Sequence, residues 1–301
     1  MYGARPRYCP VLEAVMLQVA VVTDTTACIP KEQVRKYSIE VVPIELIFGD
    51  KVYRDGIDIS PTEFYALLRQ AEKLPTTSGS LPGPYLEAYS KASKKASGIL
   101  CITESSKFSG MFNSAQVAKE MAKKDIPNVP IEVLECTTAA AGQGLVVLAA
   151  ARAAASGKSL TEVFEISRGV MRRVSLFATL DTLHYLVKGG RVPKAAGLVN
   201  SLLQIKPVFT VNEGDAHTVA LPRSTPNAMK RILKLMGQKV VKGQPLRVAV
   251  MHADALKEAI ILRNRISAQF DCAELFITEF TPVMGVHTGP GVIGVAFYSG
   301  D

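Results

Sequence analysis

Short apolar strands alternate with helices through the first half of the chain, and this alternation limits the fold more than any other feature. Four runs rich in β-branched residues have the pattern of strands, at 18–23, 41–48, 98–103 and 131–135. Helical patterns lie between and after them, at 30–37, 61–73, 84–96, 111–124 and 143–155. Because strands joined by helices need right-handed crossovers, the pattern predicts a mostly parallel sheet with flanking helices.

The pattern changes beyond residue 160. Helices are expected at 161–174, 181–190, 194–203, 225–238 and 254–267, and strands at 175–180, 247–253, 273–280 and 292–298. Residues 206–222 have the pattern of a β-hairpin that turns at 212–215. This mixture predicts a smaller α+β domain with a mainly antiparallel sheet. The expected division is an N-terminal extension (1–17), an α/β domain (18–160) and an α+β domain (161–301), with either Met1 or Met16 as the start.

Charge and cysteine content narrow the class of protein. The net charge is +8, but the lysines and arginines are scattered over expected helix faces without interleaved aromatic residues. Specific nucleic-acid binding is therefore disfavoured, although a regulatory or nucleic-acid-binding module remains an alternative. The five cysteines form no C-x-x-C pair, and no Cys/His pair has the spacing of zinc ligands. No apolar run approaches the roughly 18 residues of a membrane span. We expect a cytoplasmic protein with reduced cysteines and no metal.

Two nucleotide-binding patterns fail on their context. Gly289, Gly291 and Gly294 match G-x-G-x-x-G, but that motif must open a helix, and the residues after Gly294 have the composition of a strand. The segment 155–159 ends in Gly-Lys-Ser, like a P-loop, yet Arg152 occupies the position of the required first glycine. We interpret this segment as a helix end and a turn.

Hydroxyl-rich loops precede two of the expected helices. One carries Thr76, Thr77 and Ser78, and the other carries Ser106 and Ser109. The unpaired amides and the positive dipole end of a helix N-terminus favour an anion, so these loops are candidate sites for a carboxylate or phosphate. Simple helix capping explains them locally as well.

A histidine and an arginine are further candidates. His287 lies between valines and a Thr-Gly-Pro-Gly run, with no Asp or Glu beside it. A hydrolase in which His287 activates a serine stays open as an alternative, but Ser109 lacks the glycine of a nucleophile elbow. Arg191 follows two glycines that end an expected helix, which fits either a surface arginine or one offered to an anion.

Six segments, in order, resemble one known family. They are VAVVTDTTACIP (19–30), YRDGIDISPTEFYALL (53–68), PTTSGS (75–80), ITESSKFSGMFNSAQVA (102–118), LDTLHYLVKGGRV (180–192) and GVHTGPGVIGVAFY (285–298). Together they are similar to the DegV family of fatty-acid-binding proteins, which includes the binding subunits (FakB) of bacterial fatty acid kinase. The resemblance extends over nearly the whole chain from about Gln18. Gly79 departs from the commoner T-S-Q-P form of the third segment.

The resemblance implies a two-domain α/β protein of the EDD fold that buries one fatty acid, such as palmitate, stearate or oleate, between its domains. By residue match, the carboxylate is held by Thr77, Ser109 and His287. Further head-group or partner contacts are expected at Thr76, Ser78, Ser106, Gly110, Arg191 and Thr288. The implied protein is a carrier without a cofactor and is not itself an enzyme. It presents the carboxylate to a partner kinase for acyl-phosphate formation and contacts the membrane surface transiently. In this interpretation, the Gly-Pro-Gly run lets the backbone pass close to the head group.

Overall fold

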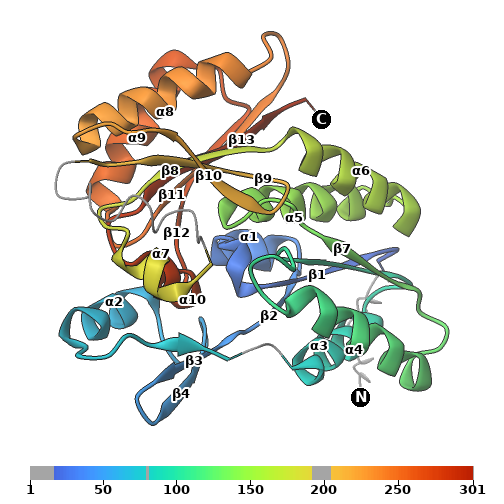
Figure 1. Cartoon of the computed structure of the whole chain (residues 1–301). Coiled ribbons are helices and arrows are strands. Elements are labelled where there is room, and N and C mark those ends of the chain that lie inside the picture. Colours follow the sequence, from blue (N-terminus) through green and yellow to red (C-terminus); the bar gives the residue numbers. More distant parts are fainter. Residues whose placement is uncertain (1–16, 79–80, 192–204, 301) are drawn as a thin grey trace, which may run out of the picture.

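Two sheets lie on opposite sides of one central helix in the computed structural model of the chain, which describes residues 17–78, 81–191 and 205–300 (Figure 1). The first sheet is parallel, in the order β2 (Glu40–Val42), β1 (Ala20–Asp24), β6 (Ile99–Thr103), β7 (Ile131–Glu135). One face is covered by α3 (Pro82–Ser93) and α4 (Met111–Asp125), and the other by α5 (Ala141–Ala155) and α6 (Leu160–Arg173). The parallel sheet expected from the alternating pattern is confirmed.

The second sheet is antiparallel except at one edge. Its order is β10 (Asp215–Ala220), β9 (Val208–Asn212), β8 (Ser175–Thr179), β13 (Ile293–Ser299), β11 (Leu246–His252), β12 (Glu274–Glu279), and β11 and β12 are parallel. Its outer face packs on α8 (Thr225–Lys239) and α9 (Leu256–Gln269). The mainly antiparallel sheet, the hairpin of β9 and β10, and the closing strand all agree with the sequence predictions.

Helix α5 joins the two halves because it is apolar on every side. Nearly all of its residues are buried, and it contacts both β1 of the first sheet and β11 and β13 of the second. A helix that is apolar all round must be covered all round. Small side chains let the neighbouring chain come close: a Cβ at Gly144 would collide with the carbonyl oxygen of Ala27. The turn after α5 ends at Ser159, the N-cap of α6, so the P-loop-like segment is a helix end and a turn.

The prediction of one strand at 41–48 is wrong in one respect, because the structure has two strands there, one on each side of Pro43. Proline has no N–H to donate to a neighbouring strand, and β2 ends just before it. Beyond Pro43 the chain enters a separate antiparallel sheet, in the order β4 (Lys51–Arg54), β3 (Glu45–Phe48), β5 (Thr76–Thr77). A two-residue Gly-Asp turn joins β3 to β4, and Gly49 has φ 62°. This small sheet was not predicted, although a Gly-Asp pair is a hairpin signal.

Three short helices complete the described fold around the small sheet and the first strand. They are α1 (Lys31–Lys36), α7 (His184–Gly189) and α10 (Pro282–Thr288), with a 3-10 turn at Thr25–Ala27. Helix α2 (Pro61–Gln70) begins with the expected capping box of Ser60 and Glu63. Helix α10 was not predicted, and α7 starts three residues later than expected. The helix expected at 194–203 and residues 1–16 of the expected extension lie outside the described residues.

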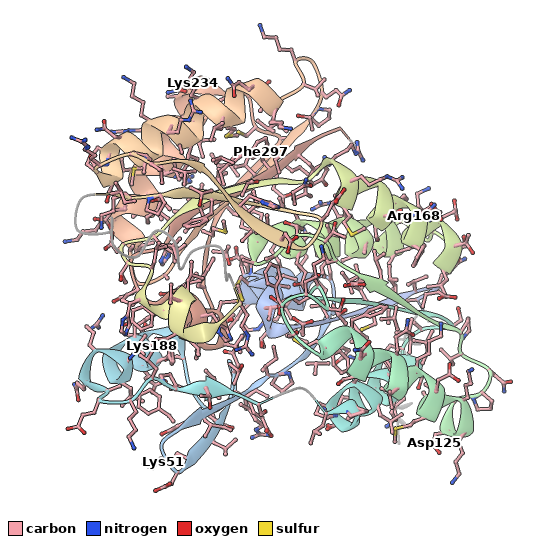
Figure 2. The ribbon with its side chains drawn as sticks, viewed as in Figure 1. Lys51, Asp125, Arg168, Lys188, Lys234 and Phe297 are labelled. Carbon is pink, nitrogen blue, oxygen red and sulfur yellow. The ribbon has the colours of Figure 1, made fainter. Side chains whose placement is uncertain are left out.

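Charged residues on the outer helices face solvent, as the sequence interpretation proposed for the scattered lysines and arginines. Lys234 on α8, Arg168 on α6 and Asp125 at the end of α4 are exposed and point outward (Figure 2). Phe297 of β13, by contrast, is 1% exposed and packs near Phe177 of β8. The basic side chains therefore act as solvated helix faces.

Candidate functional site

A cavity lies where the carboxyl ends of the first sheet face the inner side of the second sheet. The volume of this cavity is about 200 Å³. Loops after β1, β6 and β7 border it on one side, and β8, β9, β11, α7 and α10 border it on the other. The carboxyl ends of parallel strands are where ligands bind in open α/β sheets. The fold therefore places the cavity at the general ligand position of its class.

Most of the cavity wall is apolar. The second sheet and its neighbouring segments contribute Leu176, Ala178, Leu180, Phe209, Val211, Ala216, Met251, Phe280 and Val292, and the short helices contribute Leu186, Val283 and Met284. Strand residues that alternate toward one face line such a wall naturally, because every second side chain points the same way. This part of the cavity can hold an aliphatic chain, but its side chains provide no hydrogen-bond partners for a charged group.

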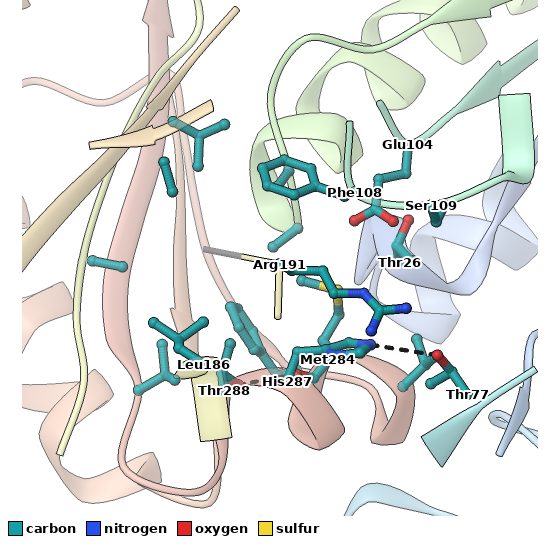
Figure 3. Close-up of a pocket in the computed structure, with 18 of the residues that line it drawn as sticks. Thr26, Thr77, Glu104, Phe108, Ser109, Leu186, Arg191, Met284, His287 and Thr288 are labelled. Atoms are coloured by element: carbon teal, nitrogen blue, oxygen red, sulfur yellow. Dashed lines mark hydrogen bonds between the residues drawn. The ribbon is translucent and has the colours of Figure 1, made fainter. Parts of the chain in front are cut away.

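Polar side chains gather at the other end of the cavity. Figure 3 shows Thr26, Glu104 and Ser109 on one side of this polar end, with Thr77 and His287 opposite and the Arg191 guanidinium between them. Leu186 lies away from this group (Figure 3). The site is thus amphipathic, with an apolar body and one polar end.

Seven of the nine candidate residues named from the sequence lie in the cavity lining. They are Thr77, Ser78, Ser109, Gly110, Arg191, His287 and Thr288. They come from four separate regions of the chain, namely β5, the loop before α4, the end of α7, and α10. Sequence order alone does not bring these regions together.

The other two candidates, Thr76 and Ser106, are not among the lining residues. Thr76 is exposed and neighbours Thr77 in a strand, so the two side chains point to opposite faces of the small sheet. Ser106 is also exposed, and both its amide and its hydroxyl donate to Oε1 of Glu135, at 2.7 and 2.6 Å. The expectation that Ser106 and Thr76 contact the head group therefore has no geometric support.

His287 lies in the last turn of α10, and burial keeps its imidazole neutral. Its Nε2 is 3.4 Å from the Thr77 hydroxyl, and its Nδ1 is buried without a hydrogen-bond partner in the described part of the chain. Burial, together with the positive charge of Arg191, lowers the pKa of His287 to about 4. At neutral pH the ring therefore carries one N–H and one acceptor nitrogen. The N–H can donate to an anion without carrying a full charge.

The glycines around His287 make room for neighbouring side chains. A Cβ at Gly189 of α7 would lie 2.9 Å from His287 Nδ1. Gly289 has φ 69°, and a Cβ there would overlap the ring of Tyr185, while a Cβ at Gly291 would overlap the carboxylate of Asp181. None of Gly289, Pro290 and Gly291 is among the lining residues of the cavity, so the interpretation that this run serves close approach to a head group has no geometric support. These glycines let α7 and its preceding loop pack against the end of α10.

Glu104 is a lining residue that the sequence analysis did not single out. It follows β6 directly and is 7% exposed. Burial, together with the charge of the nearby Asp24, raises its pKa to about 8, while Ser109 and Arg191 act in the opposite direction. The only sequence signal was its place in the segment ITESSKFSG, at the end of an apolar strand where a carboxyl side chain is unexpected.

Asp24 lies behind Glu104 and is fully enclosed in hydrogen bonds. Its carboxylate accepts from the amide of Thr26 at 3.0 Å, the amide of Glu104 at 3.3 Å, and the side chains of Gln143 and Tyr85 at 3.4 Å each. The Thr26 hydroxyl also donates to it. Burial raises the pKa of Asp24 to about 6, although these donors lower it. Asp24 thus holds the β1 and β6 loops together and does not itself line the cavity.

The site lacks the arrangement of a serine hydrolase within the described residues. A triad needs an acid on the second ring nitrogen of the histidine, and Nδ1 of His287 has no partner in that part of the chain. In the three described ranges, no group of three or more His, Cys, Asp or Glu side chains could hold a metal ion. Among the described helices, none combines the length and the apolarity that crossing a membrane requires.

Comparison with known proteins places the chain in a well-populated group. The family model described as "Uncharacterised protein, DegV family" matches residues 18–300. A DegV domain-containing protein of Clostridium perfringens is 32% identical over 281 residues, which cover 93% of this chain and 99% of that relative.

Two solved structures share the fold over nearly their whole length. One is a DegV family protein from Thermus thermophilus whose structure is described as showing fatty acid binding. It has a TM-score of 0.85 and 28% identity, and the match covers 94% of this chain and all of that one. The other is a stearic acid-binding protein from Eubacterium ventriosum, with a TM-score of 0.86 and 25% identity over 94% of this chain and 98% of that one. The likeness in fold therefore extends over both sheets.

Proposed function

Because this chain belongs to the DegV family, we propose that it binds one long-chain fatty acid in the cavity between its two sheets. The acyl tail lies along the apolar wall of the second sheet, and the carboxylate lies at the polar end beside Thr77, Ser109 and His287. The observation that carries the proposal is the amphipathic lining, which has a long apolar body and a single cluster of polar side chains. Two similar structures described as fatty-acid-binding support the same ligand class.

Burial of the tail is sufficient to drive binding. Each methylene removed from water contributes about 0.8 kcal/mol, so about fourteen of them contribute on the order of 10 kcal/mol before the costs of association. The wall that receives them is formed by β8, β9 and β11 and contains no charged residue among its lining side chains. The carboxylate head group then needs only hydrogen-bond donors, because a carboxylate buried without donors would cancel much of the free energy gained from the tail.

Neutral donors and helix ends satisfy the carboxylate. The hydroxyls of Thr77 and Ser109 and the neutral ring of His287 offer hydrogen bonds. Gly110 and Met111, at the start of α4, also line the cavity, as do Ala139 and Ala140 at the start of α5. The amides at these two helix N-termini favour a negative charge.

The proposed role is that of a carrier in the cytoplasm that hands the fatty acid to a separate kinase, which forms an acyl phosphate on the presented carboxylate. Arg191 is exposed at the end of α7 and at the same time lines the polar end of the cavity. A guanidinium in that position can contact the bound carboxylate, an acidic partner surface or an anionic membrane surface. No step of this transfer requires a nucleophile of the carrier itself.

The test is the identity of whatever remains bound after purification. We expect organic extraction of the native protein, followed by mass spectrometry, to release a long-chain fatty acid at a near-equimolar ratio. Delipidated protein should rebind such an acid with a stoichiometry of one. A protein that carries no lipid, rebinds none and hydrolyses an ester substrate would contradict the proposal and favour the hydrolase alternative.

A further inference from the structure

Glu104 stands out among the lining residues because a fatty-acid site should exclude a second carboxylate. Its side chain projects toward Thr26 and the Arg191 guanidinium at the polar end of the cavity (Figure 3). Two carboxylates in one enclosed site repel each other, so at least one of them must hold a proton. The bound ligand would bring the second carboxylate.

The groups that face Glu104 keep it protonated at neutral pH. Burial raises its pKa to about 8, and the charge of Asp24, from β1, acts in the same direction. Ser109, in the loop before α4, and Arg191, at the end of α7, oppose this rise. The Asp24 carboxylate already accepts from five donors, which are the amide and hydroxyl of Thr26, the amide of Glu104, and the side chains of Gln143 and Tyr85.

The other titratable groups nearby are either kept neutral by burial or engaged with other partners. Burial lowers the pKa of His287, on α10, to about 4 and raises the pKa of the Cys28 and Cys136 thiols to about 12 each. Glu135 of β7 accepts from Ser106, and Lys107 donates to the carbonyl oxygen of Glu213 at 2.8 Å. The neutral acid is therefore the resting form of Glu104 below about pH 8.

We propose that Glu104 determines which head group this site accepts, by donating its own proton in a hydrogen bond to the ligand carboxylate. This inference rests on the proposed function and assigns one of its contacts. In the complex, one proton is shared between two carboxyl groups, namely the Glu104 O–H and the fatty-acid carboxylate. Once Glu104 has lost that proton, binding of the anion must take up one proton from solvent. A long-chain alcohol does not need the Glu104 proton, because its own O–H can donate to the ionised Glu104.

The test compares oleate with oleyl alcohol on delipidated wild-type protein between pH 7 and 9.5. We expect the oleate affinity to fall about tenfold for each pH unit above about pH 8, since each unit removes the required proton from nine in ten molecules. The affinity for oleyl alcohol should stay constant or rise. This comparison needs no variant and so does not depend on whether a substitution folds.

Two variants assign the effect. Glu104→Gln keeps a donor that does not titrate, so its oleate affinity should not change between pH 7 and 9.5. Glu87→Gln removes an exposed carboxyl of α3, outside the cavity lining, and should behave as wild type. A wild-type oleate affinity that does not change with pH, or a pH dependence that survives in Glu104→Gln, would overturn the inference. Absence of saturable oleate binding at every pH would instead overturn the proposed function.

Discussion

At the scale of single residues, the polar end of the cavity is a set of uncharged donors grouped around one exposed arginine. His287 is neutral because it is buried and close to the Arg191 charge, and Thr77 lies 3.4 Å from its Nε2. Neutral donors suit a ligand that must enter and leave, since no buried ion pair has to form or break. The pKa of His287 should rise when a carboxylate binds beside it, because an anion favours the imidazolium.

We predict that the double substitution of His287→Ala and Ser109→Ala weakens fatty-acid binding by roughly 10- to 100-fold and leaves the fold intact. Each change removes a hydrogen-bond donor to the carboxylate, and hydrogen bonds to charged groups contribute about 1.5–3 kcal/mol. Water that enters the space left by the side chain restores part of this free energy. Titration with a long-chain fatty acid measures the affinity, and circular dichroism checks the fold.

The matched control is Thr76→Ala with Ser106→Ala. These residues have the same chemistry and lie near the site in sequence, but neither lines the cavity. The loop at Ser106 stays attached because its backbone amide also donates to Glu135. We expect an affinity within about twofold of wild type. An equal loss in both double variants would show that the cavity lining does not decide binding.

At the scale of elements, the helix that carries His287 is held by a residue distant in sequence. Helix α10 has no side-chain cap of its own, and Oδ2 of Asp55 accepts from the amide of Val283 at 3.3 Å. Asp55 follows β4 and is 1% exposed, and burial raises its pKa to about 7, while Thr25 and Thr281 lower it. The small sheet thus anchors the N-terminus of α10 and, through it, the position of His287.

We predict that Asp55→Ala lowers both stability and fatty-acid affinity, whereas Ser60→Ala lowers stability alone. Both changes remove a cap, which costs about 0.5–2 kcal/mol, and the first also leaves a buried amide unpaired. Ser60 caps α2, which carries no lining residue. Thermal unfolding and fatty-acid titration of the two variants separate the effects. Wild-type affinity in Asp55→Ala would mean that His287 is positioned by other contacts.

At the scale of the whole molecule, three buried carboxyls couple stability to pH. Burial raises the pKa of Glu104 to about 8, of Asp55 to about 7 and of Asp24 to about 6. The folded state therefore binds more protons than the unfolded state, and the stability from these groups is lost as pH rises toward 8. His287 has a lowered pKa and acts in the opposite direction, but its effect is confined to pH below about 6.5.

We predict that the delipidated protein has a Tm several degrees lower at pH 8.5 than at pH 6.5. Each proton released on unfolding changes stability by up to about 1.4 kcal/mol per pH unit. Delipidation is needed because a bound ligand raises the Tm by itself. Calorimetry of wild type and Glu104→Gln measures the effect, and the variant should show a smaller difference. A Tm that rises between pH 6.5 and 8.5 would refute the assigned pKa directions.

Most helices and strands of the two large sheets were predictable from the sequence because they depend on neighbours within a few residues. Apolar periodicity marked β1, β6 and β7, the Ser60 capping box marked the start of α2, and a four-residue turn marked the hairpin of β9 and β10. The family resemblance also pointed to seven residues that line the cavity, since motif residues recur in order along the chain.

What only the tertiary structure decided is which of these side chains face one space. Thr76 and Thr77 are equivalent in sequence, but the pleat of β5 points only one of them into the cavity. Pro43 ends β2 so that β3 lies in a separate sheet, Asp55 caps a helix 228 residues away, and the charge of Arg191 acts on Glu104 at the polar end of the cavity. These outcomes depend on contacts between distant segments. Such contacts form only when both sheets pack on α5, and no local pattern encodes them.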